Sequence, residues 1–161
     1  MSRAFVKEID DAPPPPPPER PISAAPNRVT PRGAGIIDET VAGLEQQLTE
    51  SPAAQDAAVL RRDLRYWLAR QASMQIVQPI DAPTRVGFGT RVTILRGTQT
   101  RKLTIVGEDQ ADPTAGLVAW TAPLARAIDG AIAGDVVEFE IAARSASISI
   151  LTVSKVDDKF D

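Results

Sequence analysis

Three carboxylates stand close together in the stretch GEDQADPTAG, which lies between two glycines: Glu108, Asp109 and Asp112. Carboxylates at this spacing can exchange protons with a substrate or hold a hard cation such as Mg²⁺. Asp, Pro and Gly also favour tight turns, in which water solvates the charges. Both interpretations fit the spacing, and the turn is favoured because the stretch is short and lies between apolar runs.

The residue types that the sequence lacks limit the chemistry of any site. It contains neither Cys nor His, which excludes a thiolate nucleophile, Cys-ligated zinc and a Ser-His-Asp triad. The usual general base near neutral pH is also missing, and there is no Walker-type glycine loop. We therefore expect a protein that is not itself an enzyme, without a metal site or a cofactor.

The composition is typical of a protein that folds around a hydrophobic core. Of its 161 residues, 24% are charged and 43% are hydrophobic, as in soluble proteins. The aromatic share of 4% and the net charge of −3 argue against stacking on nucleic-acid bases or attraction to DNA and anionic membranes. No apolar run is long enough to span a bilayer and no signal peptide is evident, so we expect a cytoplasmic protein.

Residues 1–28 are rich in proline, with a run of six from Pro13 to Pro18 and two more at Pro21 and Pro26. Such a segment cannot build a helix or an inner strand. We expect a disordered tail, and the alternative is a ligand for a proline-binding module.

Residues 29–78 have the apolar spacing of two helices. Thr30 and Pro31 suit the N-cap and first position of one helix, and Ser51 and Pro52 suit those of the next. Apolar residues recur three or four positions apart in both halves: Ile37, Val41, Leu44 and Leu48, then Ala57, Leu60, Leu64, Trp67 and Met74. These two stripes predict an antiparallel helical hairpin.

Four arginines follow the second predicted helix: Arg61, Arg62, Arg65 and Arg70. Acidic residues elsewhere in the hairpin balance their charge. We therefore expect a solvated face rather than a nucleic-acid patch.

From residue 84 to 155 the apolar period changes to alternation, which is typical of strands, and the domain that holds these strands is assigned to residues 79–155. The stretches RVTILR, RKLTIVG, GLVAW, GDVVEFEIA and SISILTV read as strands, and APLARAIDG reads as a short helix. The predicted fold class is α+β, with the hairpin followed by a mostly antiparallel sheet that carries one helix. Residues 156–161 are assigned to a tail.

A resemblance to a known family rests on residues 103–140, LTIVGEDQADPTAGLVAWTAPLARAIDGAIAGDVVEFE. Their order and spacing resemble the C-terminal domain of the bacterial GreA/GreB transcription elongation factors, and the likeness runs over residues 85–153. VTPRG and ARQASMQIV, at the two ends of the hairpin, resemble the boundaries of the family's coiled coil. The resemblance implies an FKBP-like domain preceded by a short coiled coil. In that family the acidic stretch is a turn, so Glu108, Asp109 and Asp112 are expected to be structural or solvated.

The resemblance also implies a partner. Gre factors insert the coiled coil into the secondary channel of RNA polymerase, where acidic residues at its tip help to hold a magnesium ion in the polymerase's own active site. The family's tip motif, Gly-Asp-Leu-Ser-Glu-Asn, is missing here, and only Glu50 and Asp56 remain as weak candidates for tip carboxylates. The arm from Pro31 to Glu50 would be about 30 Å long, which is short for a cleavage factor. In this respect the chain resembles the regulator of nucleoside diphosphate kinase.

Polymerase binding is expected at the loop before the short helix, because the family's Ser-Pro loop contacts the rim of the channel. The matching residues are Trp120, Thr121, Ala122, Pro123 and Leu124, with Ala122 in place of the usual serine. The alternative is that Leu124 is a core residue and that Pro123 only begins a helix.

Three functions follow as hypotheses. The favoured one is a non-enzymatic regulator of transcription elongation, a monomer that binds bacterial RNA polymerase and makes no sequence-specific contact with nucleic acid and none with a membrane. The second is a transcript-cleavage stimulator that uses Glu50 and Asp56. The third is a peptidyl-prolyl isomerase, suggested only by the FKBP-like fold, although a fold does not confer an activity.

Overall fold

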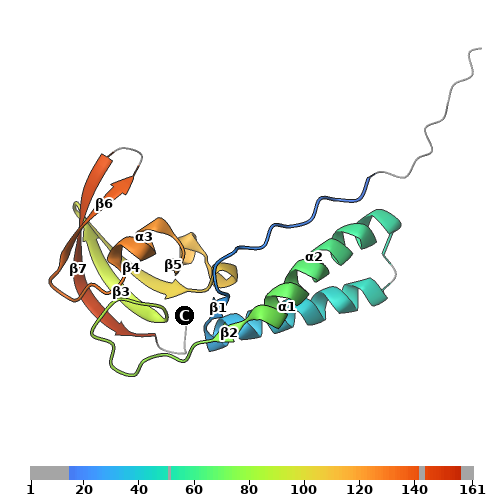
Figure 1. Cartoon of the computed structure of the whole chain (residues 1–161), viewed down its shortest axis with the longest axis horizontal. Helices are drawn as coiled ribbons and strands as arrows, with labels where there is room; N and C mark the ends of the chain where they lie inside the picture. The colour runs from blue at the N-terminus through green and yellow to red at the C-terminus, as the bar shows by residue number, and fades with distance from the viewer. Residues whose placement is uncertain (1–14, 51, 142–143, 157–161) are drawn as a thin grey trace, which may run out of the picture.

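A computed structural model of the chain describes residues 15–50, 52–141 and 144–156. A helical hairpin and a sheet domain lie end to end, and an extended N-terminal segment runs beside the hairpin (Figure 1). Ser51, expected to cap the second helix, lies outside the described residues. No helix among the described residues is long and apolar enough to cross a membrane.

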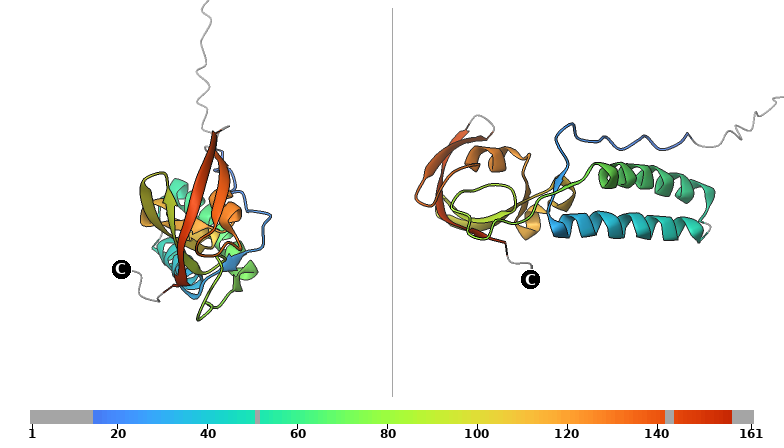
Figure 2. Two further views of the ribbon diagram at one scale, coloured as in Figure 1. Left: turned by 90° about the vertical axis from the view of Figure 1, so that its left-hand side faces the viewer. Right: turned by 60° about the horizontal axis from the view of Figure 1, so that its bottom comes forward.

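The hairpin consists of α1 (Pro31–Thr49) and α2 (Ala54–Ser73), which lie side by side (Figure 2). Thr30 caps α1 as predicted, since its hydroxyl accepts a hydrogen bond of 2.9 Å from the Gly33 N–H. Pro31 holds the first helical position, where its missing N–H costs nothing. By contrast, α2 begins after Ala53 without a side-chain cap.

The apolar seam of the hairpin is only partly buried. Ile37 and Val41 of α1 and Ala57 of α2 are buried. The remaining seam residues are half-buried: Leu44, Leu48, Leu60, Leu64, Trp67 and Met74. Two helices cover each other on one side only, so a hairpin that projects from its domain leaves the edges of the seam open to water.

Residues 15–27 form what we call the strap, an extended segment along α2 (Figures 1 and 2). Glu19 pairs with Arg65, and the Arg20 guanidinium lies 3.9 Å from the centre of the Tyr66 ring. Asn27 is buried, and its side-chain amide donates a hydrogen bond of 2.7 Å to the Arg70 carbonyl. The strap therefore differs from the disordered tail expected over residues 1–28, because it has specific partners on α2. Residues 1–14 lie outside the described residues.

The sheet has five strands in the order β5-β4-β3-β7-β6. They are β3 (Thr90–Arg96), β4 (Gln99–Val106), β5 (Leu117–Ala119), β6 (Val136–Ile141) and β7 (Arg144–Lys155). The core lies between the sheet and the short helix α3 (Pro123–Ile128), and its residues include Val92, Ile94, Ile105, Ile128, Ile148 and Ile150.

The α+β prediction is confirmed, with one addition. All neighbouring strands of this sheet are antiparallel except β4 and β5, which are parallel. Two short 3₁₀ helices, η1 (Glu108–Gln110) and η2 (Pro113–Ala115), link these strands. They carry the chain back beside Thr104, so that β5 can run parallel to the last three residues of β4.

A short parallel pair connects the two parts of the molecule. β1 (Arg28–Val29) lies beside β2 (Gln75–Ile76), which ties the start of α1 to the end of α2. β1 also passes very close to Gly107, where a Cβ atom would come within 2.6 Å of the Arg28 carbonyl oxygen. Only glycine permits this approach, which brings the hairpin against the end of β4.

Candidate functional site

Residues 107–116, which follow β4, are called the acidic loop. A set of four side chains, which we call the clamp, joins α2 to this loop: Tyr66, Arg70, Glu108 and Asp109. Arg70 Nε lies 2.5 Å from Asp109 Oδ2, and Arg70 Nη2 lies 3.4 Å from Glu108 Oε2. The side chain of Arg70 is only 2% exposed and that of Asp109 8%. The expectation that Arg70 faces solvent was wrong, because the last turns of α2 pack against η1.

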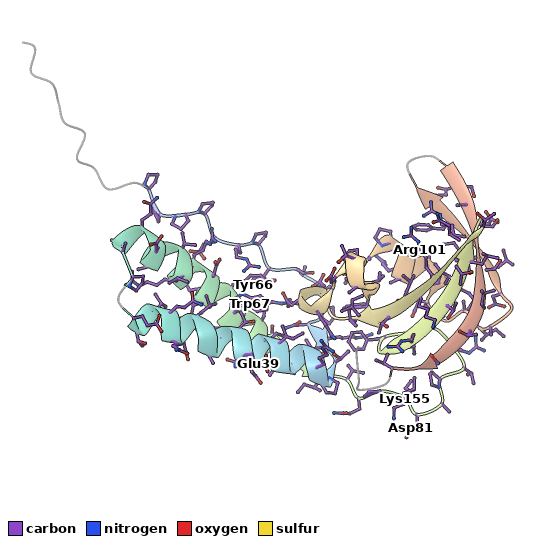
Figure 3. All side chains as sticks on the ribbon, turned by 180° about the vertical axis from the view of Figure 1, so that it is seen from behind. Glu39, Tyr66, Trp67, Asp81, Arg101 and Lys155 are labelled. Atoms are coloured by element: carbon purple, nitrogen blue, oxygen red, sulfur yellow. The ribbon has the colours of Figure 1, made fainter. Side chains whose placement is uncertain are left out.

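Tyr66 completes the clamp. Its hydroxyl donates a hydrogen bond of 2.6 Å to Asp109 Oδ1. Burial raises the pKa of Tyr66 to about 12, and the hydrogen bond and negative charge of Asp109 act in the same direction. Figure 3 shows Tyr66 and Trp67 on the side of α2 that faces the strap. Asp109 thus accepts from Tyr66 and from Arg70, two residues one helical turn apart.

The acidic loop therefore has a structural role. Glu108 and Asp109 hold the clamp, whereas Asp112 caps η2 and accepts hydrogen bonds from the N–H and the hydroxyl of Thr114, at 2.9 and 2.6 Å. The hydroxyl bond is the main reason why the pKa of Asp112 is lowered. The three carboxylates do not converge on one point, since Asp112 is used within its own turn.

The predicted binding stretch, Trp120 to Leu124, leads from β5 into α3. Pro123 is exposed and opens the helix, while Trp120 and Leu124 are partly buried against the core. Ala122 occupies the N-cap position without a side-chain hydrogen bond. Thr121 contacts the clamp, because its hydroxyl donates a hydrogen bond of 3.0 Å to Glu108 Oε1. A hydrogen-bonded path thus connects this stretch to α2 through Glu108 and Arg70.

The two candidate tip carboxylates lie at the other end of the hairpin. Glu50 follows α1 and accepts a hydrogen bond of 3.4 Å from Gln46, and Asp56 lies in the first turn of α2. Both line an open groove of about 480 Å³ together with Pro52 and Leu60. Over the described part of the chain, no group of three or more Asp, Glu, His or Cys side chains could hold a metal ion.

Local sequence patterns do not predict the clamp. Tyr66 and Arg70 are 43 and 39 residues away from Asp109, so no local pattern links them. The only usable signal was their spacing of four on one helix, which places both side chains on the same face.

Comparisons with known proteins relate the sheet domain to one family of transcription factors. Residues 80–155 match the family model described as "Transcription elongation factor, GreA/GreB, C-term". The transcription elongation factor GreA of Xanthomonas axonopodis pv. citri is 34% identical over 84 residues, which cover 50% of this chain and 52% of that protein. GreA of Mesoplasma florum is 28% identical over 127 residues, covering 74% of this chain and 81% of the relative.

Solved structures give a more distant likeness. A prokaryotic GreA/GreB factor from Nitrosomonas europaea aligns with 81% of this chain and 98% of its own, at 20% identity and a TM-score of 0.40. The chain spans about half the length of the Xanthomonas relative, and the matched family domain holds the acidic loop, the binding stretch and α3. Residues 80–155, just under half of the chain, are thus similar to the C-terminal domain of the GreA/GreB transcription elongation factors.

Proposed function

We propose that this protein binds bacterial RNA polymerase at its secondary channel and regulates transcription elongation without catalysis of its own. Residues 79–155 are the docking domain, and residues 29–78 are the arm. The binding stretch, Trp120 to Leu124, makes the contact and is called the docking stretch below. Support comes from the family and from the exposed Pro123 at the start of α3. The protein acts as a monomer in the cytoplasm and needs no cofactor.

The observation that carries this proposal is the path from the docking stretch to the arm. Thr121 bonds to Glu108, Glu108 pairs with Arg70, and Arg70 lies in α2. An arm fixed in this way points in one direction relative to the docking domain. Binding at the rim of a channel would then place the arm in the channel without a further search.

The length and tip of the arm favour regulation over cleavage. α1 has 19 residues, which gives about 28 Å at 1.5 Å per residue. A carboxylate must come within about 2.0–2.1 Å of Mg²⁺ to coordinate it, so a small shortfall in reach removes direct coordination. The shared groove of Glu50 and Asp56 keeps the cleavage stimulator as a second candidate.

A transcript-cleavage assay on backtracked elongation complexes separates the two candidates. We expect saturating wild-type protein to release no short 3′ RNA fragments, while a cleavage-competent GreA releases them in parallel. Release by wild-type protein that is lost in Glu50→Gln/Asp56→Asn, with polymerase binding intact, would replace the regulator by the cleavage stimulator.

A further inference from the structure

A cavity of about 190 Å³ lies between β1 and α3, beside the docking stretch. Val86, Ile105 and Ala125 form apolar walls, and Trp120 contributes its indole. Pockets for drug-sized ligands are larger, about 300–1,000 Å³. The cavity therefore suits a single side chain.

One buried donor and two exposed guanidinium groups of this cavity have no hydrogen-bond or ion-pair partner among the described residues. The indole Nε1 of Trp120 is buried and has no hydrogen-bond partner among the described residues. Arg28, whose guanidinium lies 4.9 Å from the centre of the Trp120 ring, forms no ion pair with any described carboxylate, and the same holds for Arg126. Buried donors are nearly always satisfied in folded proteins, so the indole N–H marks a place for an acceptor.

The charges of the lining define the acceptor. Arg28 and Arg126 contribute two positive charges and Asp129 one negative charge, which leaves one positive charge in excess. Guanidinium groups bind carboxylates with strong, charge-assisted hydrogen bonds. The apolar walls suit the methylene groups that carry a carboxylate in Asp or Glu.

We infer that this cavity receives an acidic side chain of RNA polymerase, whose carboxylate binds Arg28 and Arg126 and accepts from the indole N–H of Trp120. The inference rests on the proposed function for the identity of the partner. It adds a specific recognition pocket next to the docking stretch, and it gives Arg28, at the base of the arm, a role in binding.

The first test measures the affinity for core RNA polymerase. Arg28→Gln/Arg126→Gln should bind about tenfold more weakly than wild type or worse, as expected for the loss of charged hydrogen bonds. The control is Arg101→Gln/Lys102→Gln, which removes the same charge from two exposed positions outside the cavity, the docking stretch and the arm, and it should change affinity by less than about twofold. Equal affinities of the two double variants would overturn the inference.

The second test needs no polymerase. The chain has two Trp residues, so an NMR spectrum shows two indole N–H signals, which Trp67→Phe assigns. The probe is a capped Gly-Glu-Gly peptide, compared with Gly-Gln-Gly. The Glu peptide should shift the Trp120 signal and leave Trp67 in place, and the Gln peptide should shift neither.

The two tests together distinguish the possible failures. A Trp120 shift in a protein that does not bind polymerase would refute the proposed function and retain the carboxylate pocket. Identical effects of the Glu and Gln peptides would refute the carboxylate pocket, whatever the polymerase measurement shows.

Discussion

Replacement of Arg70 by Met should destabilise the protein by about 3–5 kcal/mol, the usual cost of removing one partner from a buried ion pair. The size of this loss in stability follows from the burial of the pair, since the Arg70 and Asp109 side chains are 2% and 8% exposed. Met retains much of the apolar stem, so the loss comes mainly from Asp109, which would stay buried without its cation. Tyr66 alone cannot neutralise that charge.

Urea unfolding followed by circular dichroism measures this loss. Arg61→Met, at an exposed position of the same helix, is the control and should change the free energy of unfolding by less than about 0.5 kcal/mol. Arg70→Met/Asp109→Asn removes both charges and should recover part of the loss. A free energy of unfolding for Arg70→Met within about 1 kcal/mol of wild type would refute the clamp as a stabilising element.

Three further changes test separate parts of the structure. The pKa of Tyr66 is raised from 10 to about 12, so the stability that this hydroxyl contributes is complete below about pH 10 and is lost as the pH rises through about 12. Tyrosinate absorbance follows this residue alone, because the chain has one Tyr. A titration midpoint near pH 10 would contradict the hydrogen bond to Asp109. Gly107→Ala should lower the free energy of unfolding by about 1–3 kcal/mol or more, because the new Cβ would meet the Arg28 carbonyl oxygen at 2.6 Å. The control is Gly43→Ala, whose Cβ would meet nothing within 4 Å and which should be neutral or stabilising in thermal unfolding. Leu64→Asp should weaken the hairpin by placing a charge in the seam, and an unchanged helical signal in circular dichroism would argue against the packing of α1 on α2.

Local sequence patterns predicted the elements but not the contacts between them. The seam through Ile37 and Val41 predicted α1, and alternation around Ile94 and Ile105 predicted β3 and β4, because each pattern reports which face of its own element is buried. The strap could not be predicted from its proline content, since its position depends on Arg20 stacking against a ring on α2.

The candidate site was also predicted only in part. The binding stretch stays a prediction from the family resemblance, and the structure shows of it only that Pro123 begins α3. The clamp was missed because Arg70 and Asp109 are 39 residues apart and a charged residue on a helix is normally solvated. Its burial follows from the close approach of β1 to Gly107, a tertiary feature that no local pattern encodes.

The central claim, docking at the secondary channel of RNA polymerase through the stretch before α3, is tested most directly by competition. Labelled GreA is bound to core polymerase, and unlabelled protein is added while the fluorescence anisotropy of the label is followed. We expect wild-type protein to displace the label at saturation, and we expect Pro123→Asp, with unchanged circular dichroism, to require a much higher concentration. No displacement by wild-type protein at saturation would contradict the claim.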